Sequence, residues 1–296
     1  MVNSAASAVT SNEKKLKHRS LARKIWGQCY IWFFLLLMYV PILVLIASSF
    51  TNSEVIGQWN GFSFDLYARL FHDEEIGIAL GNTIILALTS GVISTILGTM
   101  GAIGTFYSKK VWKGIIENTT QIPVVNAEIV IALSLTVLFV FCGNYIFGGT
   151  NIFSFWTLLA GHVILSLPFV YLSVKPKLQQ MDPDLEEAAL DLGCTPFQAF
   201  TKVVIHEIMP GIISGALMAF TMSLDDFVIS YFVTGSSFIT LPVEIYNYTK
   251  KPIQPKIYAL FTLMFAVILV LMVVMNLLQA RSEKRVQHGA QRRVHG

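Results

Sequence analysis

Apolar residues are gathered along this chain into long runs that short polar stretches separate. The runs cover residues 25–50, 80–107, 115–141, 152–174, 209–233 and 257–280. An α-helix of about twenty residues crosses the hydrocarbon layer of a bilayer, so each run is long enough to span it. The pattern therefore predicts an all-α membrane protein with six transmembrane helices.

The composition and the placement of charge add an orientation to this prediction. Hydrophobic residues make up 54% of the chain and charged residues 13%, which is unusual for a soluble domain. Of the 21 Lys and Arg residues, all but Arg69, Lys250, Lys251 and Lys256 fall on one predicted side of the membrane. Because basic residues favour the cytosolic side, we expect both termini to be cytoplasmic. The net charge of +3 follows this topology and does not indicate nucleic-acid binding.

The polar segments outside the runs differ in character. Residues 1–24 and 281–296 are basic, and we expect both to lie in the cytoplasm, the tail against the inner membrane surface. Residues 51–78 form the longest predicted external loop and are rich in aromatic and acidic residues. Its negative charge either reflects ordinary topology or attracts a cationic ligand or its carrier. Glycines such as Gly91 and Gly98 in the second run predict close helix packing.

A predicted cytosolic segment at 182–208 carries two helix-start signals in a row. Asp182-Pro183 and Thr195-Pro196 each place a capping side chain before a proline at the first helical position. Gly193 lies between them, where the end of a helix favours a residue that can adopt positive φ. The segment is predicted to be a compact helix–turn–helix suited to docking.

The same segment carries a recognisable motif. Glu187-Ala188-Ala189, three further residues and Gly193 resemble the cytoplasmic loop signature of the inner-membrane permease subunits of ABC importers. The aliphatic run that follows is Val203-Val204-Ile205, but His206 stands where that family usually has proline. The resemblance covers residues 79–280 as the permease transmembrane domain, and 25–78 more loosely as the first helix with its external loop. The run from Ser223 to Ser230 is similar to the spermidine/putrescine branch.

The resemblance implies a type I ABC importer permease fold in a bacterial cytoplasmic membrane. It implies four kinds of partner: a second permease subunit, a cytosolic ATPase dimer, an extracytoplasmic substrate-binding protein and membrane lipid. ATP and Mg²⁺ would bind to the ATPase, and this chain would bind no cofactor. The residues expected to dock on the ATPase are Glu186, Glu187, Ala188, Ala189, Asp191 and Gly193. Charge there would set register, and alanines would allow close approach.

Acidic residues inside the predicted spans point to a substrate. Glu128 lies in the third run, and Asp225 and Asp226 lie in the fifth, both near the predicted midplane. A buried carboxylate is costly, and we find no Lys or Arg deep in a span to pair with these three. A cationic guest would pair with them, and the predicted pathway also includes Ser223, Phe227 and Tyr231. Alternatively, the acids fix helix packing or line an external vestibule.

Other functions remain as alternatives. An importer of the same class could carry another organic cation, thiamine or ferric iron. An autonomous ion-coupled transporter would use the buried acids for protons or Na⁺, and ATP dependence separates the two classes. His162 and His206 are isolated in the sequence, so no metal site is expected. Neither a phosphate-binding Gly-rich loop nor a nucleophile–base pair is apparent, so an enzyme is not expected.

Overall fold

The computed structural model describes residues 28–51, 58–182, 184–235, 238–250, 257–270, 272–274 and 276–277. Within these residues, six helices are long and apolar enough to cross a membrane. They are Gln28–Ser48, Glu74–Tyr107, Glu128–Tyr145, Phe155–Gln180, Pro196–Asp225 and Ile257–Val274. The predicted all-α architecture with six membrane-spanning helices is confirmed. The predicted basic segments 1–24 and 281–296 lie outside the described residues.

The chain forms two compact units, and the first contains the chain through Leu70 with a short part of the last helix. Here Phe50 stacks on Phe62, with ring centroids 5.3 Å apart and an interplanar angle of 8°. The hydroxyl groups of Ser49 and Tyr67 lie 2.7 Å apart, and Tyr67 belongs to the short helix α2 (Asp65–Phe71). These contacts hold the described part of the predicted external loop against the end of the first helix.

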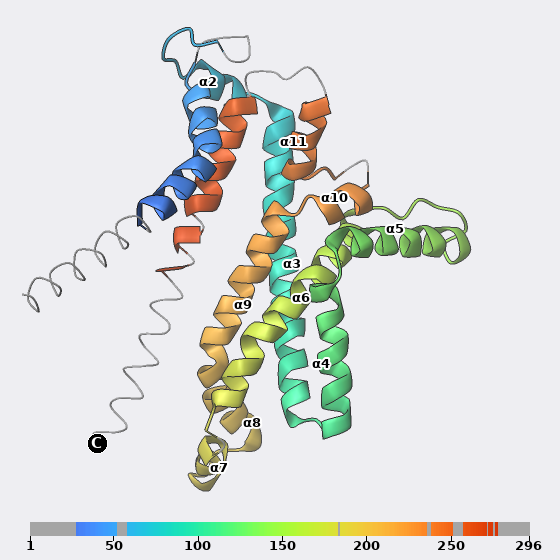
Figure 1. The fold of residues 1–296 in the computed structure, drawn as a ribbon. Coiled ribbons are helices and arrows are strands. Elements are labelled where there is room, and N and C mark those ends of the chain that lie inside the picture. The colour runs from blue at the N-terminus through green and yellow to red at the C-terminus, as the bar shows by residue number, and fades with distance from the viewer. Residues whose placement is uncertain are drawn as a thin grey trace, which may run out of the picture. The chain divides into compact units, whose positions relative to one another are not determined.

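The second unit is built on three long helices, α3 (Glu74–Tyr107), α6 (Phe155–Gln180) and α9 (Ile205–Asp225), which pack together (Figure 1). Their shared core contains Ala102, Val170, Tyr171, Val174, Leu178, Met181, Val204, Ile208 and Ala219. Gly98 allows the closest approach of α3 to α6, because a Cβ at that position would lie 2.7 Å from the Cβ of Val170. The predicted role of small residues in the second span is confirmed at this position.

The prediction that residues 115–141 form one continuous helix, the third span, is wrong. The structure divides it into α4 (Lys110–Val125) and α5 (Glu128–Tyr145), with Asn126 extended at φ −75° and ψ 146°. Pro123 lies near the end of α4, and it cannot donate the backbone hydrogen bond that continues a helix. As a result, Glu128 lies in the first turn of a new helix, where a negative charge suits the helix dipole.

The fifth predicted span, 209–233, also breaks. α9 ends at Asp225, Asp226 is extended at φ −63° and ψ 119°, and the short α10 (Val228–Val233) follows. α11 (Leu241–Lys250) comes next and packs on α3, where Leu241 N–H donates to Thr83 Oγ1 at 2.8 Å. The two breaks therefore place all three predicted acids at helix ends, whereas the sequence predicted them inside continuous helices.

Candidate functional site

The break between α9 and α10 is held by the Asp226 side chain. Its two carboxylate oxygens accept hydrogen bonds from the backbone N–H groups of Ile229, at 3.3 Å, and Ser230, at 2.8 Å. The first N–H groups of a helix lack partners within it, so this carboxylate caps α10. Asp226 is only 5% exposed. Its side chain is therefore committed to the backbone of its own chain.

His162 of α6 is the second partner of Asp226. Its Nε2 lies 3.4 Å from Asp226 Oδ2 and 3.1 Å from Ser230 Oγ, and its Nδ1 lies 2.8 Å from Ser223 Oγ. Ser90 of α3 in turn donates to Ser223 Oγ at 2.8 Å. This geometry favours a ring proton on Nε2, directed at the carboxylate, with Ser223 donating to Nδ1. The network joins α3, α6, α9 and α10.

Sequence reasoning considered His162 only as a possible metal ligand and did not predict its polar partners. Its partners Ser223 and Ser230 lie 61 and 68 residues further along the chain, so no local spacing could reveal them. Ser223 was predicted to line the substrate pathway, yet it is 3% exposed and belongs to this network. The geometry of Asp226 fits the alternative that the acids fix helix packing, and Ser223 belongs to the same buried network.

The other two acids are more accessible than Asp226. Asp225 is exposed at the end of α9, although Asp226 follows it immediately. Glu128 is partly exposed, and its side chain lies close enough to Asp226 for the two carboxyl groups to interact. The structure thus brings Glu128 to the α9–α10 break and leaves Asp225 accessible at the end of α9.

Aromatic rings surround the same break. The ring centroids of Phe227 and Tyr231 are 5.4 Å apart, and both lie near Tyr246 of α11, at 4.9 Å and 5.3 Å. We call these three residues the aromatic cage. Tyr231 and Tyr246 are each 37% exposed, so both rings are accessible. Sequence reasoning named Phe227 and Tyr231 but missed Tyr246, because α11 carries it after the last part of the predicted fifth span.

The predicted docking segment is a helix–turn–helix, as expected. α7 (Asp184–Asp191) is followed by Gly193, which has φ +87°, and the N–H groups of Gly193 and Cys194 donate to Leu190 O and Ala189 O, respectively. This pair of bonds is a Schellman motif, which requires positive φ at the glycine position. α8 (Pro196–Ala199) begins with a reciprocal capping box between Thr195 and Gln198. The Pro183 signal lies outside the described residues.

The π-helical turn η1 (Phe200–Val204) joins α8 to α9 and lies just before His206. The backbone remains helical from α8 into α9, and Pro210 lies inside α9. The change from the usual proline to His206 therefore does not interrupt the helix.

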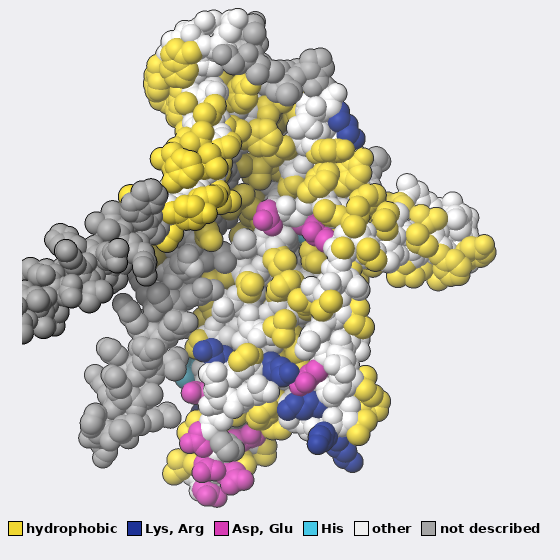
Figure 2. Space-filling view, viewed as in Figure 1, with side chains coloured by type: hydrophobic (Ala, Val, Ile, Leu, Met, Phe, Trp, Pro, Cys, Tyr) yellow, Lys and Arg dark blue, Asp and Glu magenta, His cyan; other side chains and the backbone are white. Residues whose placement is uncertain are grey.

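The faces of α7 have different surroundings. Ala189 is buried and Leu185 packs on the core that α3, α6 and α9 share, whereas Leu192 is 87% exposed. The apolar residues of this segment are therefore divided between the chain's own core and its surface. Figure 2 shows acidic side chains gathered over α7, and Glu187 is among the exposed residues of this helix. Glu186 instead accepts a hydrogen bond from the Tyr107 hydroxyl at 2.7 Å.

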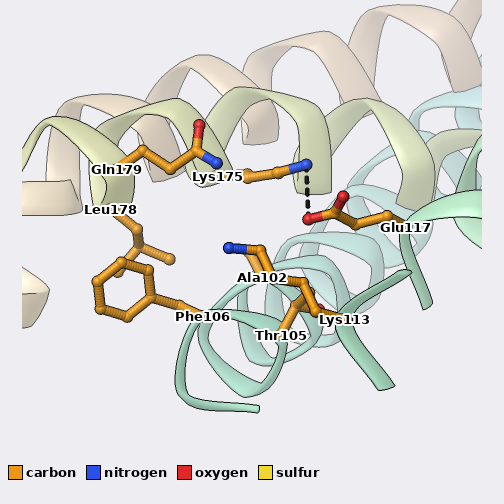
Figure 3. A pocket seen from close by; sticks show the side chains of 8 residues that line it. All are labelled: Ala102, Thr105, Phe106, Lys113, Glu117, Lys175, Leu178 and Gln179. Carbon is orange, nitrogen blue, oxygen red and sulfur yellow. Dashed lines mark ion pairs between the residues drawn. The ribbon is translucent and has the colours of Figure 1, made fainter. Parts of the chain in front are cut away.

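A small pocket lies between α3, α4 and α6 (Figure 3). It is lined by Ala102, Thr105, Phe106, Lys113, Glu117, Lys175, Leu178 and Gln179. Lys175 Nζ forms an ion pair with Glu117 Oε1 at 2.8 Å, which links α6 to α4. Its basic residues make it unsuitable for a polyamine, so we assign the pocket to helix packing.

Proteins of known sequence resemble this chain over most of its length. Spermidine/putrescine transport system permease protein PotC of Escherichia coli (strain K12) is 32% identical over 252 residues, which cover 85% of this chain and 92% of that protein. Putrescine transport system permease protein PotI of the same organism is 33% identical over 264 residues, covering 88% and 92%.

Solved structures share the fold. A bacterial ABC transporter involved in the import of the acidic polysaccharide alginate matches with a TM-score of 0.70 and 17% identity, over 90% of this chain and 98% of that one. An amino acid ABC transporter with histidines matches with a TM-score of 0.55 and 18% identity, over 73% and 98%. The expected type I ABC importer permease fold is confirmed.

Residues 91–288 match the family described as binding-protein-dependent transport system inner membrane component. The match, together with the six apolar helices, makes this a multi-pass protein of the bacterial inner membrane. The resemblance seen in the Glu-Ala-Ala and glycine signature is confirmed. The chain belongs to the family of inner-membrane permease components of binding-protein-dependent ABC transporters.

Proposed function

We propose that this chain is the permease subunit of an ATP-driven importer of polyamines such as spermidine and putrescine. The observation that carries the proposal is the α9–α10 break, where Glu128 and Asp225 lie with the aromatic cage. The relatives named as spermidine/putrescine permeases support the same substrate class. The surrounding helices belong to an importer permease fold, so the break is a candidate part of the pathway.

The chemistry of this break suits a chain of amines. A polyamine carries ammonium groups separated by methylene segments, so it needs separate acceptors joined by apolar walls. Asp225 is exposed and offers a carboxylate, and the rings of Phe227 and Tyr231 offer faces that attract cations. Asp226 contributes indirectly, because its bonds to α10 and His162 hold the break in shape.

We propose that the segment from α7 to α8 docks on a cytosolic ATPase dimer that binds ATP and Mg²⁺. The exposed Leu192 and Phe197 offer apolar contacts, and Glu187 and Asp191 add charge that would set register. Tyr107 ties Glu186 to α3, so movement of the segment would reach the core helices. Closure of the ATPase would then drive alternating access, with a second permease subunit and an extracytoplasmic binding protein completing the complex.

The test is the ATPase activity of the complex reconstituted in lipid nanodiscs with its binding protein. Spermidine, putrescine, thiamine, ferric iron and phosphate are compared as ligands. Stimulation by a polyamine supports the proposal. Stimulation by another ligand keeps the importer class and rejects the assignment of the acids and rings to a polyamine. Failure to assemble with any ATPase would favour an ion-coupled transporter.

A further inference from the structure

The aromatic cage already holds an ammonium group of the chain itself. The Nζ atom of Lys250, at the end of α11, lies 4.4 Å from the ring centroid of Tyr246 and 5.3 Å from that of Tyr231. It also donates a hydrogen bond to the Tyr231 hydroxyl at 3.4 Å. Both ring distances are within the range of a cation–π interaction, about 6 Å. The cage therefore binds a primary ammonium in this conformation.

The Lys250 side chain has the chemistry of one end of a short diamine. It is a primary ammonium on a chain of four methylene groups, and putrescine is two primary ammonium groups joined by four methylenes. A site that accepts the lysine end accepts the diamine end by the same contacts. Asp225, exposed two residues before Phe227, provides a carboxylate in the same break.

We propose that the aromatic cage binds a terminal ammonium group of the transported polyamine, and that Lys250 is a tethered occupant that the substrate displaces. This inference rests on the proposed function and adds a binding site and a competing residue to it. While Lys250 occupies the cage, its charge repels a second cation. A substrate amine enters as the lysine leaves, so Lys250 weakens retention of the substrate and favours its release.

The contacts of Lys250 suit a displaceable group better than a fixed support. Within the described part of the chain, its nitrogen forms no ion pair with a carboxylate. Lys250 itself is exposed, and the two tyrosine rings it covers are partly exposed. An exposed ammonium held by rings and one hydroxyl is bound weakly, and it can exchange with another ammonium at small cost.

The test is equilibrium binding of radiolabelled putrescine to the nanodisc complex of this chain, its partner permease and the ATPase, without the binding protein. Lys250→Gln removes the occupant and should lower the dissociation constant about 3- to 10-fold. Lys110→Gln removes the same charge from an exposed lysine at the start of α4 and should leave the constant unchanged. Lys250→Met replaces Lys250→Gln if the latter does not assemble.

Two further variants tie the effect to the cage. Tyr246→Leu in the Lys250→Gln background should abolish the gain in putrescine affinity, because it removes the ring that the ammonium approaches most closely. Tyr246→Phe in that background should retain most of it. Binding by Lys250→Gln that is no tighter than binding by Lys110→Gln overturns the inference.

Polyamine stimulation of the ATPase is measured on the same preparations with the binding protein. It distinguishes failure of the role proposed for Lys250 from failure of the proposed function. A stimulated wild-type complex with unchanged binding in Lys250→Gln overturns the role of Lys250 alone. A wild-type complex that no polyamine stimulates overturns the proposed function, and this inference with it.

Discussion

His162 Nε2 lies 3.4 Å from the Asp226 carboxylate, and both side chains are completely shielded from solvent. Asp225, the adjacent residue, is exposed. The two neighbouring acids therefore differ in their surroundings, although they look equivalent in the sequence. Asp226 supports the α9–α10 break, whereas Asp225 is accessible at the end of α9.

Removal of the imidazole should destabilise the permease. His162→Ala removes one buried partner from each of Asp226, Ser223 and Ser230, and a buried polar group left unsatisfied costs about 1–3 kcal/mol. We expect a clear drop in the thermal unfolding temperature of the detergent-solubilised complex. His206→Ala changes an exposed histidine and serves as the control. Equal unfolding temperatures for the two variants would show that the network does not stabilise the fold.

Substitution of each of the two adjacent acids should have a different effect on transport and on stability. Asp225→Asn should lower polyamine transport and leave the unfolding temperature unchanged, because the side chain is exposed. Asp226→Asn should lower the unfolding temperature, because the amide has one acceptor oxygen where the carboxylate has two, and a buried group left without its partner costs about 1–3 kcal/mol. Transport assays and thermal unfolding on the same preparations distinguish them. A stability loss in Asp225→Asn with normal transport would reverse the assignment.

The docking segment can be tested without disturbing the core. Glu187→Lys reverses an exposed charge on α7 and should weaken association with the ATPase while membrane insertion stays normal. Co-purification of the ATPase with tagged permease measures this association. Glu74→Lys makes the same reversal at the start of α3 and should co-purify normally. If both variants retain the ATPase, α7 is not the docking surface.

The contact of α3 with α6 predicts a contrast between two glycines. Gly98→Ala would place a Cβ 2.7 Å from Val170 Cβ, and such overpacking costs about 1–3 kcal/mol. Gly104→Ala meets no atom within 4 Å and should be neutral or slightly stabilising. Thermal unfolding of both variants measures the difference. Destabilisation of Gly104→Ala by as much as Gly98→Ala would argue against the packing described.

The sequence predicted the features that depend on nearby residues. The spans follow from the length of apolar runs, and the helix–turn–helix follows from Thr195, Pro196 and Gly193. Pro123 and Asn126 indicated an irregularity in the third span, whereas the second break, at Asp226, was missed because apolar residues continue on both sides of it. Asp226 is of a residue type that often caps a helix, and this was the one local signal of the second break.

The site itself depends on contacts between distant segments. His162 meets Ser223 and Ser230 only after α6, α9 and α10 pack together. Tyr246 lies beside Phe227 only because α11 packs near the α9–α10 break. Neither contact leaves a periodic signal in the chain. The acids were therefore recognised as candidates, but their division into a supporting residue and an accessible one required the fold.

The most direct test of the central claim is the accumulation of radiolabelled spermidine in proteoliposomes that contain the complete complex, with ATP and the ATPase inside and the binding protein outside. The account predicts accumulation that requires ATP and the binding protein and that Asp225→Asn reduces. Accumulation driven by a proton or Na⁺ gradient without ATP, or ATP-dependent transport that excludes spermidine and putrescine, would contradict it.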